Sequence, residues 1–214
     1  MSGSISRLES EWLKDAARLS ASKAAPILQD VLTRHAEPHR RYHGANHLVA
    51  LFDLLAHHAP HIVRGSAPRL AIWWHDAIYD PQAHDNEARS ADLAYSHLLQ
   101  LGAPATLIEE TVRLIHQTTN HWSGGLYGDG DYFLDADIAV LGAPPEVYDQ
   151  YAAGVRHEYA WAPDDAYRAG RSTFLVGALD RPRLFRTDAF ETAYAEQARI
   201  NMRRELTTLT GTSR

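Results

Sequence analysis

Apolar residues recur along this chain at every third or fourth position rather than at every second one. This spacing places them on one face of an α-helix, whereas a half-exposed β-strand would alternate strictly between apolar and polar residues. A first example is the stripe formed by Leu8, Trp12, Ala16 and Leu19. No long run of the chain alternates strictly, so the pattern predicts an all-α fold.

Prolines, glycines and capping residues indicate where the helices begin and end. We expect helices at about 6–19, 26–35, 46–58, 68–80, 85–101, 104–119, 145–161, 164–179 and 188–206, and a short element at 133–142. The glycine-rich segment HWSGGLYGDGDY, 121–132, is expected to be a loop. Length and composition favour a single domain over 1–207, followed by a frayed tail at 208–214.

The charge balance narrows the classes of partner. Lysine and arginine number 21 against 27 aspartates and glutamates, a formal net charge of −6. This charge argues against extended nucleic-acid binding through a broad basic surface, but a small phosphorylated substrate needs only local positive charge. The N-terminal string MSGSISRLESEWLKDAARLS is neither a signal peptide nor a membrane span, so no membrane association and a cytoplasmic location are expected. A homodimer is left open.

The segment AIWWHDAIYD, 71–80, places a histidine and an aspartate side by side within an apolar run. On the expected helix His75 faces the core, and Asp76 is turned about 100° from it. A lone carboxylate costs several kcal/mol to bury, so Asp76 needs a cation. Taken alone, the pair is best explained by an arginine salt bridge to Asp76, with His75 as a hydrogen-bonded core residue.

Other segments also bring imidazoles and carboxylates into apolar surroundings. His47 shares a helical stripe with core leucines, and His43 lies four residues before it. Asp135 and Asp137 lie within the largely apolar string FLDADIAVLG. Separate salt bridges would need several buried cations, whereas one divalent metal ion satisfies several ligands at once. Because the chain has no cysteine, nitrogen and oxygen ligands are expected, which suit Mn, Fe, Co, Ni or Zn and, less well, Mg.

These residues, in this order, resemble the HD-domain superfamily of metal-dependent phosphohydrolases, in which a His, a His-Asp pair and a distant Asp lie on helices. The strings RRYHGANHL, WHDAIYDPQAHDNEARSA, LDADIAVLGAP and VRHEYAW look like a bacterial subgroup described as predicted metal-dependent phosphohydrolases. The resemblance runs from residue 40 to the last helix. It implies a single HD-type helical domain with its core at about 40–180 and a metal ion among the central helices.

The same resemblance implies which residues hold the metal ion. The implied ligands are His47, His75, Asp76 and Asp137. The last motif offers two aspartates, and we expect Asp137 to be the ligand. The groups expected to support these ligands or to bind a second metal ion are His43, His121 and Asp135.

A site of this kind implies hydrolysis of a small-molecule phosphoester, such as a nucleotide, by water that the metal ion activates. Asp76 is expected to orient that water. Arg41 and Arg156 are candidates for binding phosphate, although an exposed loop and a solvated helix face containing Glu158 explain them nearly as well. Glu87 is a candidate general acid or ligand of a sugar hydroxyl, and it would also suit the first turn of a helix.

Two other classes of function remain open at this stage. Relatives of the HD fold use two iron ions to oxidise C–C or C–P bonds, so a di-iron oxygenase is one alternative. The other is a non-catalytic binding module in which the metal ion only stabilises the fold. The number of bound metal ions and the release of phosphate distinguish these alternatives from hydrolysis.

Overall fold

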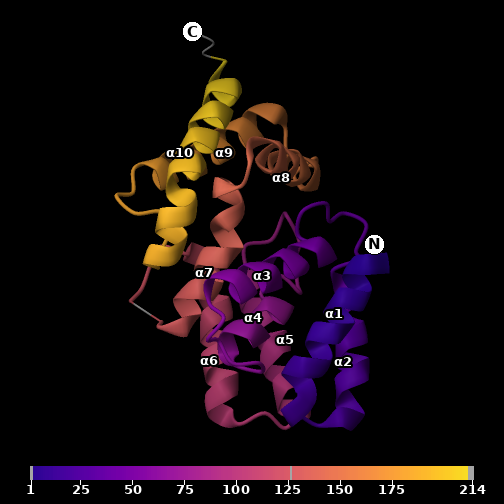
Figure 1. Ribbon diagram of the computed structural model, residues 1–214. Helices are drawn as coiled ribbons and strands as arrows, with labels where there is room; N and C mark the ends of the chain where they lie inside the picture. Colours follow the sequence, from indigo (N-terminus) through magenta and orange to yellow (C-terminus); the bar gives the residue numbers. More distant parts are fainter. Residues whose placement is uncertain (1, 126, 212–214) are drawn as a thin grey trace.

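Ten α-helices and three short 3-10 segments make up the regular structure of the described residues, 2–125 and 127–211 of a computed structural model (Figure 1). The helices are α1 (Ser2–Asp15), α2 (Ala21–Arg34), α3 (Ala45–His58), α4 (Ala67–Trp74), α5 (Asn86–Gln100), α6 (Ala105–Gln117), α7 (Asp129–Ile138), α8 (Pro145–Glu158), α9 (Asp164–Leu179) and α10 (Asp188–Thr210). The 3-10 segments are η1 (Ala16–Arg18), η2 (Thr118–Asn120) and η3 (Ala139–Gly142). These residues contain no strand, so the prediction of an all-α fold is confirmed.

Helix α4 is the centre of the arrangement. It packs against α3, α5, α6 and α7, and all eight of its residues are buried. A helix that is covered on every side belongs in the core of a protein. In Figure 1 the helices α1, α2, α5 and α6 lie around α3 and α4, and α8, α9 and α10 form the opposite end of the molecule beyond α7. The chain leaving α4 therefore starts from the middle of the fold.

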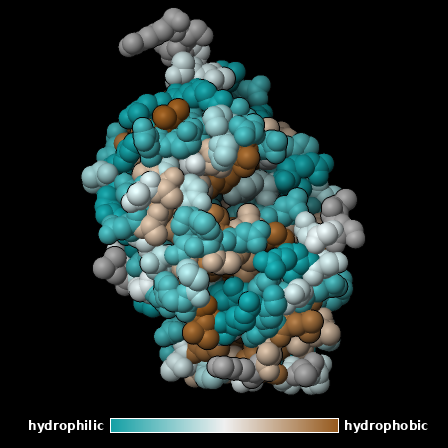
Figure 2. All heavy atoms as spheres, viewed as in Figure 1, coloured by the Kyte–Doolittle hydropathy of each residue, from teal (hydrophilic) through white to brown (hydrophobic). Residues whose placement is uncertain are grey.

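The outer surface is mostly hydrophilic, and apolar atoms gather in the middle of the face seen in Figure 2. Between α3, η3 and α8 lies an apolar groove of about 630 Å³, whose lining includes Leu51, Leu54 and Val147. None of the described helices is both long and apolar enough to cross a membrane.

The prediction that one helix runs through residue 80 is wrong, because α4 ends at Trp74. Side chains bind the next backbone groups in place of a continuing helix. The guanidinium of Arg40 donates to the carbonyl oxygens of Asp76 and Ala77 at 2.6 and 3.1 Å. The Oγ of Ser90 accepts a hydrogen bond from the backbone N–H of Ile78 at 3.0 Å. Because these groups are satisfied without helical hydrogen bonds, the chain can turn directly after His75.

Several other boundaries also differ from the prediction. The glycine-rich segment is not a loop to its end, because α7 begins at Asp129, directly after Gly128 with its positive φ of 60°. Asp129 and Asp131 suit the first turn of that helix. The expected element at 133–142 is divided between α7 and η3. Helix α2 begins before Pro26, and α10 continues to Thr210, into the tail expected to be frayed; residues 212–214 lie outside the described part.

A buried ion cluster joins α1 to α4. The Arg69 guanidinium donates to the carboxylates of Asp15 at 2.7 Å and of Glu11 at 2.6 Å. The three side chains are only 7%, 0% and 5% exposed, respectively. The indole N–H of Trp73 also donates to Asp15, at 3.3 Å. Arginine thus neutralises both of the carboxylates buried here.

Replacing Arg69 with methionine should therefore strongly destabilise the protein. The change would leave the fully buried Asp15 carboxylate without a cation, whereas Glu11 keeps its ion pairs with Arg7, Lys14 and Arg64. The expected loss in free energy of unfolding is about 3–5 kcal/mol. Arg204→Met is the matched control, because Arg204 makes a similar two-point contact with Asp149 at the surface, where the side chains are 45% and 58% exposed. That control should lose about 1 kcal/mol or less. Equal losses in urea denaturation would contradict the prediction.

Candidate metal centre

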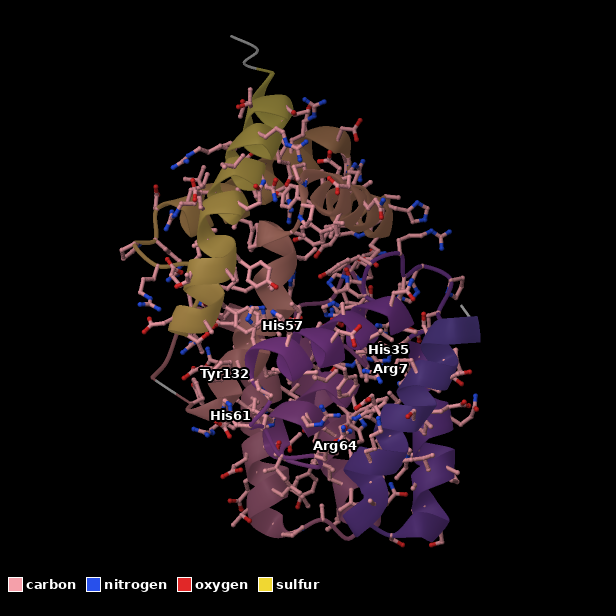
Figure 3. All side chains as sticks on the ribbon, viewed as in Figure 1. Arg7, His35, His57, His61, Arg64 and Tyr132 are labelled. Carbon is pink, nitrogen blue, oxygen red and sulfur yellow. The ribbon has the colours of Figure 1, made fainter. Side chains whose placement is uncertain are left out.

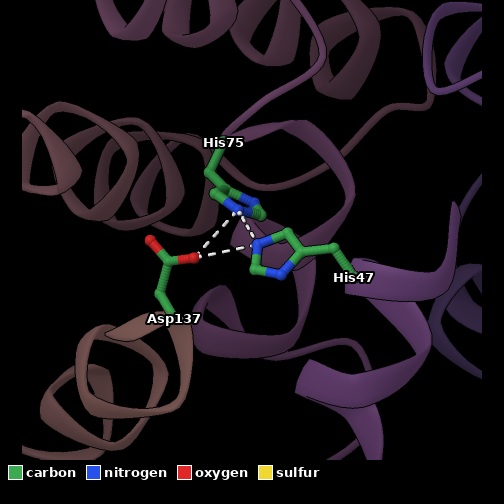
Figure 4. Close-up of side chains that lie close together, drawn as sticks. All are labelled: His47, His75 and Asp137. Atoms are coloured by element: carbon green, nitrogen blue, oxygen red, sulfur yellow. Dashed lines mark hydrogen bonds and ion pairs between the residues drawn. The ribbon is translucent and has the colours of Figure 1, made fainter. Parts of the chain in front are cut away.

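Three metal-type ligands from separate parts of the chain meet at one point (Figure 4). His47 comes from the first turn of α3, His75 directly follows α4, and Asp137 lies in the last turn of α7. The Nε2 atoms of the two histidines are 3.1 Å apart, and they lie 3.0 and 3.3 Å, respectively, from Oδ1 of the aspartate. All the ligand atoms lie within 4.8 Å of one another. One ion can therefore contact all three.

Asp76 and His121 complete this cluster. Oδ2 of Asp76 lies 3.2 Å from Nε2 of His75 and 3.7 Å from Nε2 of His47. His121 contacts the other oxygen of Asp137, with its Nε2 2.7 Å from Oδ2. Three of the four predicted ligands thus converge, the fourth, Asp76, lies beside the two histidines, and His121 contacts Asp137.

The hydrogen bonds of His75 fit it to bind a metal ion. Its Nδ1 lies 3.1 Å from the backbone carbonyl oxygen of Ile72, an acceptor that requires the proton to be on Nδ1. In a neutral ring Nε2 then carries the lone pair, and this is the atom that faces His47 and Asp137. A histidine that ligates a metal ion usually donates its other N–H in this way. The donor set, two imidazoles and carboxylate oxygen, suits a divalent transition metal.

The alternative explanation of the His-Asp pair, an arginine salt bridge, does not fit the structure. No lysine or arginine among the described residues lies within ion-pair distance of the carboxylates of Asp76 or Asp137; their charged partners there are histidines. Arg40 does reach Asp76, but it binds the backbone carbonyl oxygen at 2.6 Å. The two side chains are only 19% and 11% exposed. They therefore lack the permanent cation that Arg69 provides elsewhere.

The electrostatics of the cluster follow from this arrangement. Burial on its own would raise the pKa of Asp76 and of Asp137, but neighbouring imidazoles, chiefly His75, hold both pKa values well below the usual range. Burial would lower the pKa of His75, yet the two carboxylates raise it well above its usual value. The pKa of His47 is lowered, mainly by burial. A divalent ion bound here would replace the proton that His75 otherwise holds.

Asp135 does not belong to the cluster, so the prediction that it supports the ligands or binds a second metal ion is wrong. Its carboxylate accepts hydrogen bonds from the backbone N–H groups of Arg186 and Thr187, both at 2.7 Å, and from the Thr187 hydroxyl at 2.8 Å. Two residues along a helix differ by about 200° in direction, which is why Asp135 and Asp137 face opposite sides of α7. Asp135 holds the start of α10 instead.

Sequence reasoning missed the role of Glu158, which the pattern assigned to a solvated helix face. The residue is only 4% exposed. Its Oε1 accepts the backbone N–H groups of Arg41, Tyr42 and His43 at 2.7, 2.7 and 3.0 Å. Its Oε2 accepts from Nδ1 of His43 at 2.6 Å and from the Tyr79 hydroxyl at 3.0 Å. One carboxylate thus organises the whole turn before α3.

The contact with Glu158 also determines the state of His43. Burial lowers the pKa of His43, but Asp76 and Glu158 outweigh that effect and raise it above the ordinary value. Burial would raise the pKa of Glu158, yet the hydrogen bonds from His43 and the backbone lower it to about 2. With Nδ1 donating to Glu158, the Nε2 of His43 has no hydrogen-bond partner among the described residues, and His43 lines the cavity described next.

A cavity of about 430 Å³ opens over the cluster. Asp76 and Asp137 reach it from the metal-ligand side, and His43 and His121 lie beside them. Glu87, in the first turn of α5, also lines this space, as its predicted role requires. The volume suits a small molecule.

The structure does not bring Arg41 or Arg156 to this cavity. The Arg41 guanidinium is exposed and donates to the backbone oxygens of Pro38 and Arg40. Arg156 forms an ion pair with Asp164 and donates to a backbone oxygen at the end of α8. The prediction that they bind phosphate is therefore wrong. Arg41 lies in an exposed loop, and Arg156 pairs with Asp164 at the end of α8, although Glu158 on the same helix is buried.

His57 and His61, both labelled in Figure 3, are not among the metal-type ligands that converge at the candidate centre. His57 and His61 are exposed, and Nε2 of His61 lies 3.2 Å from the Asp129 carboxylate. The ring of His61 also contacts that of Tyr132, with 5.3 Å between centroids. These histidines belong to the surface.

No family model matches the chain, and no curated protein or solved structure shows significant similarity to it. The atoms of the site are therefore the basis for the function proposed below.

Replacing Asp137 with asparagine should weaken divalent-metal binding by at least about tenfold, because it removes a charged ligand at the point where the imidazoles converge. The matched control is Asp135→Asn, two residues away on the opposite face of α7. It should retain the affinity of the wild type, although it loosens the start of α10. Calorimetric titration with Mn²⁺ and Zn²⁺ measures both, and equal losses in the two variants would contradict the assignment.

Replacing Glu158 with glutamine should reduce the pH dependence of stability. The folded-state pKa of about 2 lies below the ordinary 4.5, so the charge stabilises the fold above about pH 4.5 and this contribution is lost as pH falls towards 2. The difference in free energy of unfolding between wild type and E158Q should therefore be largest near neutral pH and narrow below pH 4.5. Urea denaturation at several pH values measures it.

The control for this experiment is Glu146→Gln. Glu146 is exposed in the first turn of the same helix, α8, and does not contact the turn before α3. For Glu146→Gln, the difference in free energy of unfolding from the wild type should not become smaller below pH 4.5. A wild-type-to-E158Q difference that stays constant from neutral to acidic pH would count against the proposed charge on Glu158.

Proposed function

We propose that this protein is a divalent-metal-dependent hydrolase of small-molecule phosphoesters, of the HD-domain type. The observation that carries the proposal is the meeting of His47, His75, Asp76 and Asp137 at the wall of a small-molecule cavity, without a lysine or arginine among the described residues to neutralise the carboxylates. The resemblance of the motifs to the HD-domain superfamily supports the same conclusion.

A divalent ion at this site would supply Lewis acidity towards a phosphoryl oxygen and would lower the pKa of a water molecule that it binds. The protein's own contribution begins with orientation. Asp76 lines the cavity, where its carboxylate would accept a hydrogen bond from the attacking water. His121 binds the outer oxygen of Asp137 and thereby fixes the direction of that carboxylate.

His43 is suited to protonate the leaving group. Its Nδ1 proton is directed to Glu158, its pKa is raised, and its Nε2 has no hydrogen-bond partner among the described residues, while the residue lines the cavity. As the water oxygen bonds to phosphorus and the ester P–O bond breaks, the departing alkoxide takes the Nε2 proton of His43. The attacking water releases one proton to solvent, from which His43 is reprotonated. The products are an alcohol and phosphate when the substrate is a monoester. Glu87 is placed to bind a hydroxyl group of the substrate.

The donor geometry favours hydrolysis over a di-iron oxygenase. Among the described residues, one group of at least three metal-type ligands lies close enough to share an ion. With Asp135 facing the other way, the expected third member of a second site is missing. A non-catalytic module differs from the proposal only in turnover, so an activity measurement separates the two.

The test is phosphate release from a panel of phosphoesters, each assayed with Mn²⁺, Fe²⁺, Co²⁺, Ni²⁺, Zn²⁺ and Mg²⁺. We expect turnover with at least one metal ion and a loss of at least about 100-fold in kcat in His75→Ala and Asp76→Ala, since each removes a group acting on the reacting atoms. Matched controls are His57→Ala and Asp92→Ala, which replace exposed residues outside the cavity. These should retain wild-type turnover.

Two results would reject the hydrolase. One is the absence of phosphate release with every metal ion while the protein still binds metal, which would favour a structural role. The other is unchanged turnover in both cavity variants. Binding of two iron ions with oxygen consumption would instead support the oxygenase.

A further inference from the structure

A second cavity continues the one over the metal ligands. It has a volume of about 470 Å³ and lies between the end of α8 and the first half of α9. The two cavities share four lining residues: Val155, Tyr159, Arg171 and Phe174. The two cavities therefore adjoin, with carboxylates and imidazoles around the first and mainly aromatic and apolar side chains around the second, the α8–α9 cavity. The adjoining pair is called the cleft below.

The α8–α9 cavity is lined mainly by aromatic and small apolar side chains. No aspartate or glutamate is among its described lining residues. The Tyr159 ring is 6.1 Å from that of Trp161 and 6.2 Å from that of Tyr167, measured between centroids. Trp161 is 51% exposed, a large apolar surface to leave in water. Clustered aromatic side chains in a concave site are suited to stacking on a planar ring.

The charges along the cleft limit how much negative charge a ligand can carry. Arg171 is the only arginine or lysine among its described lining residues. Its guanidinium is already occupied by the Glu205 carboxylate, at 2.9 and 3.0 Å, and by the Tyr151 hydroxyl at 3.0 Å. Asp76, Asp137 and Glu87 line the same cleft. A chain of phosphates would therefore lack cations beyond the metal site.

We propose that the substrate is a phosphate monoester of an alcohol that carries an aromatic ring, and that the α8–α9 cavity binds this ring. The inference rests on the proposed function for the position of the phosphate, beside the metal ligands. The ring then reaches the space between Tyr159, Trp161 and Tyr167. Phe174, shared by both cavities, lies along the path between the two ends.

Adenosine monophosphate, ribose 5-phosphate and adenosine triphosphate are the probes for turnover. They compare one phosphate with an aromatic ring, one phosphate without an aromatic ring, and three phosphates with an aromatic ring. We expect kcat/KM to be highest for adenosine monophosphate. In Trp161→Ala, KM for this substrate should rise about tenfold with kcat changed less than about twofold, because one stacking contact is lost. Ribose 5-phosphate should be unaffected by the change.

The control is Tyr95→Ala, which removes another exposed aromatic side chain, 53% exposed, on α5 outside both cavities. It should leave KM unchanged for all three compounds. Equal kcat/KM for ribose 5-phosphate and adenosine monophosphate would overturn the ring site. Equal kcat/KM for the mono- and triphosphate would overturn the restriction to one phosphate.

Binding without turnover separates this inference from the proposed function. Calorimetry with the chelated protein should show tighter binding of adenosine monophosphate than of ribose 5-phosphate, and Trp161→Ala should abolish the difference. If this holds while no phosphoester is hydrolysed, the ring site stands and the hydrolase fails. If phosphate is released but the two compounds bind equally, the hydrolase stands and the ring site is wrong.

Discussion

Two largely buried carboxylates, Asp76 and Asp137, lie among imidazoles near the middle of this helical protein. Their partners are histidines, which carry charge only when protonated, whereas Glu11 and Asp15 are neutralised permanently by Arg69. Burying Asp76 and Asp137 without a permanently charged partner lowers the free energy of unfolding. Such an arrangement is expected at a site that can bind a cation from solution. A site of this kind also requires three segments that are distant in the sequence to meet at one point.

Other charged side chains near the site hold backbone rather than ligands. Arg40 donates hydrogen bonds to the carbonyl oxygens of His43, Asp76 and Ala77. Glu158 accepts hydrogen bonds from three backbone N–H groups in the turn before α3. Asp135 does the same at the start of α10. Each of these contacts fixes a turn that a helix alone would not specify. The ligands are thereby placed in advance, which matters for a site whose ligand atoms must meet within a few ångströms.

Periodicity and capping residues were enough to predict an all-α fold and most helix positions, because an amphipathic stripe reports local burial. The same reasoning pointed to His47 and His75, whereas the resemblance to the HD-domain superfamily selected Asp137 over Asp135. It failed where long-range contacts decide the structure. The end of α4 depends on Arg40, more than 30 residues earlier in the chain, and the role of Glu158 depends on a turn 115 residues away. The pattern of apolar and polar positions around Arg40 or Glu158 does not indicate which distant groups these side chains contact.

The proposed function also implies an order of binding. Before a metal ion is bound, the cleft presents Asp76, Asp137 and Glu87 to an incoming phosphate, and Arg171, the one arginine among its described lining residues, is already paired with Glu205. Repulsion from these carboxylates, which the proton on His75 offsets only in part, opposes the phosphate until a divalent ion binds. No aspartate or glutamate is among the described residues that line the aromatic end of the cleft. An aromatic ring can therefore bind there with or without a metal ion at the other end. Affinity for the ring and affinity for the phosphate are therefore controlled separately, the first by packing and the second by the metal ion.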